Sequence, residues 1–345
     1  MGVIRLLFLS DTHLGFDMPQ KPRIQRRRRG EEFFIHYHKA LEPAFSGDVD
    51  GVVHGGDIFF RSRVPVDLVQ KAFAPLTEIA SQGVPVYVVP GNHERSSIPY
   101  RLIASHSNIH IFDTPRSYIL RTAMGSILFT GFPYERDNIR RRFPDVMLQT
   151  GWKNLKADIY LLCIHHCVEG ASVGTQNYHY TFRYTNDVIK INDIPVAFTA
   201  VLSGHIHRYQ VLQKDHAGNR VSVPVIYAGS TERTSFQESG EQKGYVVIEI
   251  NAKQKSLQWT FHPLKNRPMF QIEINAEGMG AARLKTVICK KLDHLHSDSI
   301  VKLRILGELN NEVFSLISAS SLRAMVPTTM NIEAVPLNYR KYSTK

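Results

Sequence analysis

The sequence predicts an α/β fold in which buried strands alternate with helices, and two observations support that prediction. Short apolar runs recur without the polar alternation of a half-exposed strand, as at Val3–Ser10, Val52–Val53 and Val84–Val89. Strands buried on both faces of an α/β layer have this composition. In addition, polar or charged residues directly follow several of these runs, at the strand ends where open α/β sheets bind ligands.

The first part of the chain alternates strand and helix. Glu31–Phe45 is predicted as a helix because apolar residues recur at helical spacing, at Phe34, Tyr37, Leu41 and Ala44. Pro65 is expected to open a second helix, which Gly83 would end and Pro75 would kink or divide. Val84–Val89 would then form the third strand.

The rest of the chain predicts more strands and a second domain. Apolar strands are expected at Ser126–Gly131, Asp158–Cys163, Thr199–Ser203, Tyr245–Ile250 and Leu257–Phe261. His262–Pro268 is predicted as a linker, so residues 1–262 would form one domain and residues 268–345 a second. The second reads as a small α/β unit of Phe270–Ile274 (strand), Ala281–Leu295 (helix), Val301–Ile305 (strand), about Glu312–Leu322 (helix) and Asn331–Val335 (strand).

The composition narrows the class of protein. The 345 residues include 42 Lys and Arg against 31 Asp and Glu, a net charge of +11 that suits a polyanionic partner such as nucleic acid. Three cysteines, Cys163, Cys167 and Cys289, are too few for a disulfide framework and lack zinc-ligand spacing. We therefore expect reduced thiols and a cytoplasmic protein. Val3–Leu9 is too short for a membrane span, so no membrane association is expected.

The stretch Asp50–Phe60 presents one carboxylate, Asp57, after a buried strand and two glycines. The glycines at 55 and 56 remove side chains that would block a close approach to the backbone. An Asp after two glycines is more often part of a turn, so this motif alone indicates little.

The same pattern of an apolar run followed by Asp, Asn or His recurs along the chain. Asp11 and His13 directly follow the first strand, and residues i and i+2 of an extended chain point the same way, so the pair is either hydrogen-bonded or ligates one metal. A single histidine is more often a core or surface residue. Seven such residues, however, are too many for one ion and indicate a two-metal site: Asp11, His13, Asp57, Asn92, His165, His205 and His207.

Imidazole nitrogens beside carboxylates suit manganese, iron or zinc better than magnesium. Manganese is expected first, with iron and zinc as alternatives.

A basic run, Lys21–Arg29, carries six positive charges in nine residues. An isolated run of this kind is usually a solvated loop. Because it begins a few residues after His13, a contact to a phosphate backbone is the alternative, for which Arg26 and Arg27 are the candidates.

Five motifs, in order within residues 1–250, resemble the signature of the calcineurin-like metallophosphoesterases: Asp11-x-His13, Gly55–Gly–Asp57, Gly91–Asn92–His93–Glu94, His165 and Gly204–His205–Ile–His207. Within that superfamily, Ser10–Gly15 with the arginine-bearing loop, and Ala228–Arg233 with Phe236 and Lys243–Gly244, resemble the SbcD-type DNA repair exonucleases (the Mre-eleven nuclease family). The resemblance implies a four-layer sandwich of two mixed β-sheets flanked by helices, with a small C-terminal α/β capping domain over the nuclease site.

The resemblance also implies a role for each motif residue. One metal would be held by Asp11, His13, Asp57 and His207, and the other by Asp57, Asn92, His165 and His205, with Asp57 bridging. Two cations would clamp a phosphodiester and lower the pKa of a shared water molecule. His93 would be the general acid that protonates the leaving oxygen.

Three positions differ from what is common in the family. Glu94 stands where members often have Asp, and His166 where they often have Gln, so that His166 could compete for metal or contact substrate. Arg61 falls where related nucleases place a DNA-contacting histidine, and is expected to contact a phosphate.

The sequence thus predicts a two-metal phosphodiesterase acting on DNA, and a DNA repair exonuclease in particular. Two alternatives stay open: a phosphodiesterase for a small nucleotide or cyclic nucleotide, and a non-catalytic DNA-binding scaffold. The family implies a homodimer and an SbcC-type ATPase partner. The partner is implied less directly, because the helical tail that binds it usually follows the capping domain and this chain stops at Lys345.

One further motif, Gly170–Ala–Ser172–Val–Gly174, matches the nucleophile elbow of serine hydrolases. That elbow requires a strand directly before it and a helix directly after it. Here His165 to Glu169 intervene between the predicted strand and the motif, and the segment 176–184 lacks a helical apolar stripe, so a serine hydrolase is not expected.

Overall fold

The computed structural model describes residues 2–19, 21, 26–94, 106–175, 178–215 and 217–337, and the chain divides into two compact units. Unit 1 consists of Met1–Met18, Arg29–Thr234 and Glu241–Lys265. Unit 2 consists of Pro19–Arg28, Ser235–Gly240 and Asn266–Lys345. The basic run therefore divides: its residues up to Arg28 belong with the C-terminal part of the chain, and Arg29 belongs to unit 1.

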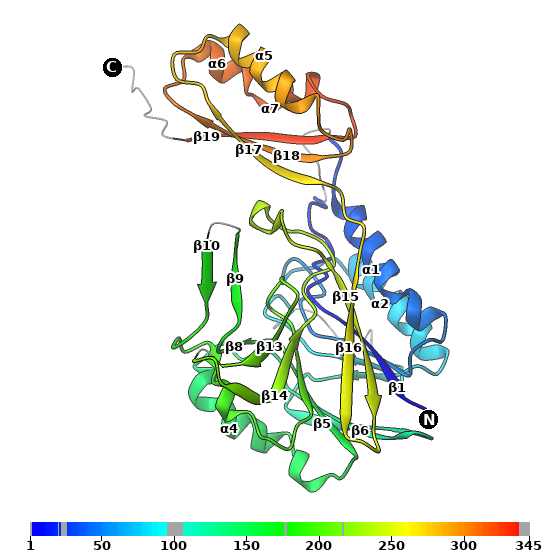
Figure 1. Ribbon diagram of the computed structural model, residues 1–345. Helices are drawn as coiled ribbons and strands as arrows, with labels where there is room; N and C mark the ends of the chain where they lie inside the picture. Colours follow the sequence, from blue (N-terminus) through cyan, green and yellow to red (C-terminus); the bar gives the residue numbers. More distant parts are fainter. Residues whose placement is uncertain are drawn as a thin grey trace. The chain divides into compact units, whose positions relative to one another are not determined.

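Two six-stranded sheets form the centre of unit 1 (Figure 1). The first has the order β16 (Ser256–Pro263), β15 (Gly244–Asn251), β1 (Ile4–Leu9), β2 (Gly51–His54), β3 (Val86–Val88) and β4 (Ile109–Ile111). The second has the order β13 (Gln210–Lys214), β14 (Arg220–Tyr227), β12 (Ala200–Ser203), β7 (Ile159–Ile164), β6 (Gly125–Gly131) and β5 (Arg116–Thr122). Both sheets are mixed: β1 pairs in parallel with β2 and antiparallel with β15, and β6 pairs in parallel with β7 and antiparallel with β5.

Helices cover the outer faces of the two sheets. The helices α1 (Gly30–Phe45) and α2 (Val66–Ser81) bury Phe33 and Phe73 against the first sheet. On the second sheet, α4 (Ile139–Gln149) buries Phe143. A third cluster, with Phe8 and Phe129, fills the space between the sheets. The predicted four-layer sandwich is confirmed.

Short elements complete unit 1: η1 (Trp152–Asn154), β8 (Cys167–Val168), β9 (Ser172–Thr175), β10 (Tyr178–Thr181), β11 (Val188–Ile189) and η2 (Ile191–Asp193). The Gly170–Gly174 motif leads into strand β9, and the next described element is strand β10 rather than a helix. The motif is therefore not a nucleophile elbow.

Unit 2 contains a three-stranded parallel sheet of β17 (Met269–Asn275), β18 (Ile300–Leu306) and β19 (Asn331–Leu337), with β18 in the middle. The helices α5 (Ala281–Leu292), α6 (Asn311–Leu316) and α7 (Ala319–Ala324) cover one face of that sheet (Figure 1). The 3₁₀ turn η3 (Phe236–Glu238) also belongs to this unit, and Lys302 of β18 lies over the Phe236 ring.

Two details of the predicted helices differ. The single helix expected at about Glu312–Leu322 is two helices, because the Ser318 hydroxyl accepts a hydrogen bond from the Ser321 N–H and so begins α7 afresh. Pro75 does not divide α2, which continues through it with Pro75 buried among apolar neighbours. Packing of an apolar face stabilises a helix more than local propensity does. No helix among the described residues is long and apolar enough to span a lipid bilayer.

Candidate metal centre

The loops at the carboxyl ends of five parallel strands meet at one place in unit 1. They bring together all seven side chains that the sequence predicts as ligands, and place His93 beside them. In the first sheet, β1 leads to Asp11 and His13, β2 leads to Asp57, and β3 leads to Asn92 and His93. In the second sheet, β7 leads to His165, and β12 leads to His205 and His207.

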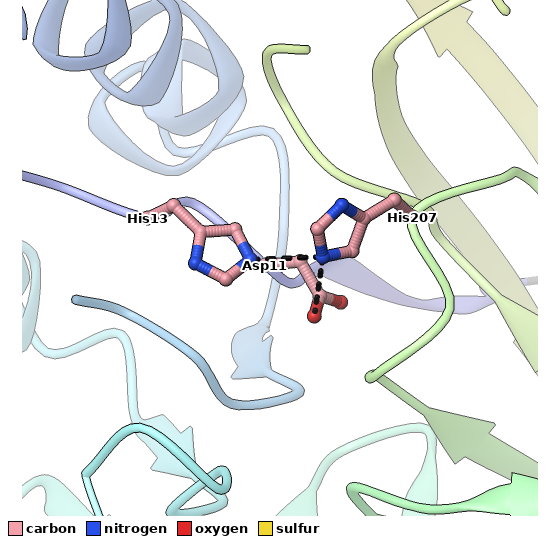
Figure 2. Close-up of side chains that lie close together, drawn as sticks. All are labelled: Asp11, His13 and His207. Carbon is pink, nitrogen blue, oxygen red and sulfur yellow. Dashed lines mark hydrogen bonds and ion pairs between the residues drawn. The ribbon is translucent and has the colours of Figure 1, made fainter. Parts of the chain in front are cut away.

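Asp11, His13 and His207 form one group of facing donor atoms (Figure 2). The Nε2 atoms of His13 and His207 lie 2.9 Å apart, and His207 Nε2 lies 3.8 Å from a carboxylate oxygen of Asp11. Asp11 is fully buried and His13 nearly so. Two imidazole nitrogens and a buried carboxylate that converge in this way can share one cation.

Asp57, Asn92, His165 and His205 form a second group. The side-chain oxygen of Asn92 lies 3.2 Å from His165 Nε2 and 2.9 Å from His205 Nδ1. Asp57 Oδ2 lies 3.4 Å from His165 Nε2. The other ring nitrogen of His165, Nδ1, donates to the Gly55 carbonyl at 2.7 Å, which leaves Nε2 as the atom that can bind a metal.

The donor chemistry of the two groups fits divalent cations. Three sets of donor atoms each lie within 4.8 Å of one another: Asp11 with His13 and His207, His13 with Asp57 and His93, and Asp11 with Asp57 and His165. Asp11, His13 and Asp57 each occur in two of these sets, so the sets overlap, and Asp57 shares one set with His13 and another with His165. Imidazoles mixed with carboxylate and amide oxygens suit manganese, iron or zinc.

Four of the predicted ligands have a strained backbone. Asp11, His13, Asp57 and His205 have φ values of 50°, 44°, 50° and 79°, a region that residues other than glycine rarely adopt. Hydrogen bonds from Asp11 N–H to the Gly56 carbonyl and from His13 N–H to the Asp57 carbonyl hold the first two loops in register. Strain of this kind persists only where the surroundings enforce it, and it concentrates at functional sites.

Glycine is required next to His165. A Cβ on Gly56, which has φ +104°, or on Gly204 would collide with His165 Nδ1 and with neighbouring backbone atoms. The glycines of the Gly55–Gly–Asp57 and Gly204–His205 motifs thus allow the His165 ring to sit against the backbone.

The buried charges interact strongly. Burial acts to raise the pKa of Asp57, but His165 above all, with His13 and His93, outweighs burial and holds that pKa below its usual range. For Asp11 burial prevails and the pKa is raised. Burial, followed by repulsion from His165, lowers the pKa of His205 to about 3, which favours a neutral ring that can bind a metal.

Glu94 has a positioning role that the sequence did not reveal. Its buried carboxylate accepts hydrogen bonds from the N–H groups of Asp57, Phe59 and Gly91, at 2.9, 2.8 and 2.8 Å. Burial and then the charge of Asp57 raise the pKa of Glu94 to about 8, and the N–H donors act in the opposite direction. The sequence feature that could have indicated this role is the position of Glu94 directly after His93 in the Gly–Asn–His–Glu motif.

His54 was also missed. Its Nδ1 accepts from Gly56 N–H at 3.2 Å, and its Nε2 lies 3.1 Å from the hydroxyl of Thr12, the residue between Asp11 and His13. Burial lowers the pKa of His54 to about 3, so it is a neutral link between two metal loops. It is the last residue of the buried strand β2, which leads to Asp57.

His93 presents one ring nitrogen to the cluster. Its Nδ1 donates to the Phe60 carbonyl at 2.6 Å, and its Nε2 lies 3.8 Å from Asp57 Oδ2. The ring is partly exposed. Arg61 is exposed, and its guanidinium lies 5.9 Å from the centre of the Phe60 ring.

The other predicted contact residues have intramolecular partners. In unit 2, Arg27 forms an ion pair with Asp298 and donates to the Thr329 carbonyl, and Arg26 donates to the Arg27 carbonyl. In unit 1, His166 Nε2 accepts from the Glu135 N–H at 3.0 Å, and its buried ring stacks on Tyr134.

Known proteins of similar sequence share the catalytic part of the chain. Residues 4–209 match the family model for the calcineurin-like phosphoesterase. The DNA double-strand break repair protein Mre11 of Thermoplasma acidophilum is 23% identical over 322 residues, covering 89% of this chain and 78% of that protein. Mre11 of Haloferax volcanii is 25% identical over 313 residues, covering 88% of this chain and 62% of that protein.

A solved structure shows a weaker likeness. A dimetal phosphatase from Danio rerio is 12% identical, with a TM-score of 0.47, and covers 76% of this chain and 97% of that one. The family match spans more than half of the chain and includes the loops that bring the donor side chains together. The chain therefore belongs to the calcineurin-like phosphoesterase family and is a metal-dependent phosphoesterase.

Proposed function

We propose that the protein is a two-metal phosphodiesterase that acts on DNA. One cation is held by Asp11, His13, Asp57 and His207, and the other by Asp57, Asn92, His165 and His205. The observation that carries the proposal is the convergence of these seven side chains, through three overlapping sets of donor atoms and through the contacts of Asn92 with His165 and His205.

The chain's own residues hold and orient the reacting groups. Cations bound there supply Lewis-acid stabilisation of the phosphodiester and lower the pKa of the attacking water. The Gly55 carbonyl fixes the His165 ring, and Glu94 holds the backbone of Asp57, so both side chains are already oriented toward the proposed cation sites. This arrangement spares the reaction the cost of reorganising them.

His93 is the general acid in this proposal. Because Nδ1 donates to the Phe60 carbonyl, the proton for the leaving oxygen is carried on Nε2, which faces the cluster. Arg61, the residue after Phe60, is placed to contact a phosphate of the substrate.

Two observations support DNA as the substrate. Both relatives described above carry a name that assigns them to double-strand break repair. The net charge of +11 favours a polyanion. Contacts of Arg26 and Arg27 to DNA phosphates stay predictions, and for Arg27 they would compete with its bonds to Asp298 and Thr329.

Hydrolysis of two substrates tests the proposal. Manganese-dependent cleavage of end-labelled linear double-stranded DNA is measured beside that of bis-p-nitrophenyl phosphate, for the wild type and for Asp57→Asn. We expect both activities in the wild type and their loss in the variant. Asp48→Asn, at an exposed position, serves as the matched control and should keep both activities.

The outcomes separate the alternatives. Hydrolysis of the small ester with DNA untouched would favour a small-nucleotide substrate over DNA. DNA binding without hydrolysis of either substrate would favour a scaffold.

Four finer points belong to the same proposal. Manganese is the expected ion, and it is tested by comparing manganese, iron and zinc at equal free concentration. A homodimer, an SbcC-type ATPase partner and a cytoplasmic location stay predictions of the sequence.

A further inference from the structure

Lys243 is a buried cation that the proposed reaction does not use. Its side chain is fully enclosed, and its Nζ lies 2.8 Å from the carbonyl oxygen of His207 and 2.8 Å from a carboxylate oxygen of Glu241. Burying an ammonium group is costly unless it is paired and hydrogen-bonded. An apolar residue would fill the same space without that cost, so packing alone does not explain a lysine here.

The partners of Lys243 form a charged bracket, which consists of Lys243, Glu241, Arg208 and Arg233. Glu241 accepts from Arg208 Nε at 3.0 Å through its carboxylate, and from Arg233 through its main-chain carbonyl at 2.7 and 3.2 Å. Arg208 directly follows His207 in the sequence. The bracket therefore holds His207 from two sides, at its own carbonyl and at the next residue.

The carbonyl of His207 receives a second hydrogen bond. Ser230 N–H donates to it at 3.0 Å, and Ser230 forms an isolated β-bridge with Ser10, the residue before Asp11. The Ser10 hydroxyl donates in turn to the Asp11 carboxylate. Lys243 and Ser230 thus tie the backbone of His207 to the strand end that presents Asp11.

The His207 and His165 rings are held in different ways. His165 is fully buried and its Nδ1 donates to a backbone carbonyl at 2.7 Å, whereas the His207 side chain is 26% exposed and its Nδ1 lies 3.4 Å from the Thr234 hydroxyl. A bond to the second ring nitrogen normally fixes the orientation of a histidine ligand. For His207 the bonds to its main-chain carbonyl act together with the contact of its ring to Thr234.

We propose that Lys243 is a positioning residue: it holds the His207 carbonyl so that Nε2 of that ring faces Asp11 and His13. The inference rests on the proposed two-metal function. In it, Lys243 affects the binding of one cation only, the one held by Asp11, His13, Asp57 and His207. Removing a residue that orients a metal ligand typically weakens metal binding by about 10- to 100-fold.

Titration of the metal-free protein with Mn²⁺, followed by calorimetry and by the Mn²⁺ EPR signal, tests the proposal. The wild type is expected to bind two ions, and Lys243→Met to weaken one of the two binding events by about 10- to 100-fold and leave the other unchanged. Lys253→Met, at an exposed lysine of the same unit, is the matched control and should titrate as the wild type does.

A second variant separates positioning from folding. Lys243→Met with Glu241→Gln removes both charges, so that no buried carboxylate is left without its lysine partner, and it should show the same selective loss. Equal weakening of both binding events together with a lower melting temperature, or no change in either event, would overturn the proposal. A wild type that binds fewer than two ions would instead overturn the proposed function on which it rests.

Discussion

The two halves of the metal centre are supported by different kinds of interaction. In the half that contains Asp57 and His165, the Gly55 carbonyl, closely packed glycines and the buried carboxyl of Glu94 hold the side chains. Because the pKa of Glu94 is raised to about 8, that carboxyl is mostly uncharged at neutral pH. In the half that contains Asp11 and His207, charged side chains hold the loops. The Lys243 bracket holds the backbone of His207, and Glu232, whose main-chain carbonyl accepts from the Ser230 hydroxyl, forms a buried ion pair with Arg29.

The difference indicates what each half tolerates. Backbone carbonyls and glycine contacts do not depend on pH, but they leave no room for an added atom. Buried ion pairs accept small changes of shape, but breaking one leaves a charge without a partner. We therefore expect the Asp57 half to be sensitive to steric change and the Asp11 half to changes of charge.

The largest effect is expected at His93, which lies beside the Asp57 half. His93→Ala should lower kcat by about 10²- to 10⁴-fold, because the leaving oxygen loses its proton donor. Turnover of bis-p-nitrophenyl phosphate and metal content are measured on the same preparation. Both ions should remain bound, since His93 is proposed to donate a proton and not to ligate.

Loss of an ion in His93→Ala would contradict that assignment. His93 would then be a ligand through the donor set that it forms with His13 and Asp57. The Asp57 half of the metal centre would then include His93, whose ring is held by the Phe60 carbonyl.

The steric sensitivity of the Asp57 half is tested at Gly56. Gly56→Ala should destabilise the protein by about 2 to 5 kcal/mol, from a positive φ together with a collision of the new Cβ with His165. The second ion should also bind more weakly. Chemical denaturation and Mn²⁺ titration measure the two effects.

Gly47→Ala is the matched control, because Gly47 has φ +72° and no atom lies within 4 Å of the added Cβ. It should cost about 1 to 2 kcal/mol, for the backbone conformation alone, and leave metal binding unchanged. Equal effects of the two substitutions would show that crowding around His165 does not matter.

The charge sensitivity of the Asp11 half is tested at Glu232. Burial acts to raise the pKa of this carboxyl, but the hydrogen bond from His36 and the charge of Arg29 lower it. Because the pKa in the folded state lies below the unfolded value of about 4.3, the stabilisation is complete above that pH and is lost as the pH falls through the folded pKa.

Glu232→Gln should therefore destabilise the protein by about 1 to 3 kcal/mol at neutral pH, and by less as the pH falls below about 4.3. The free energy of unfolding is measured for both proteins from pH 7 to pH 3.5. A difference that stays constant over this range would refute the ionic contribution. Glu78→Gln, at an exposed position of α2, should show no difference at any pH.

The sequence predicted best what depends on neighbours along the chain. Asp11, Asp57 and His165 could be singled out because each lies at or just beyond the end of an apolar strand, and the ends of parallel strands in a sandwich of two sheets meet in space. The four-layer architecture followed from the resemblance that these motifs carry.

What was missed depends on contacts distant in sequence. Glu232 meets Arg29 across 203 positions, and no local pattern marks either residue as a partner of the other. The helix α4 was not predicted either, and it carries an internal proline, Pro144, that local rules count against a helix. Such features are decided by packing, which only the folded structure reveals.

The contacts of Arg27 limit how early unit 2 can fold while the chain is being synthesised. Its partners in unit 2, Asp298 and the Thr329 carbonyl, are 271 and 302 residues further along. At a translation rate of about 5 to 20 residues per second, the segment around Arg27 waits on the order of 15 to 60 s before its partners leave the ribosome. Unit 2 therefore cannot complete its folding until residues 298 and 329 have been made, long after its segment around Arg27.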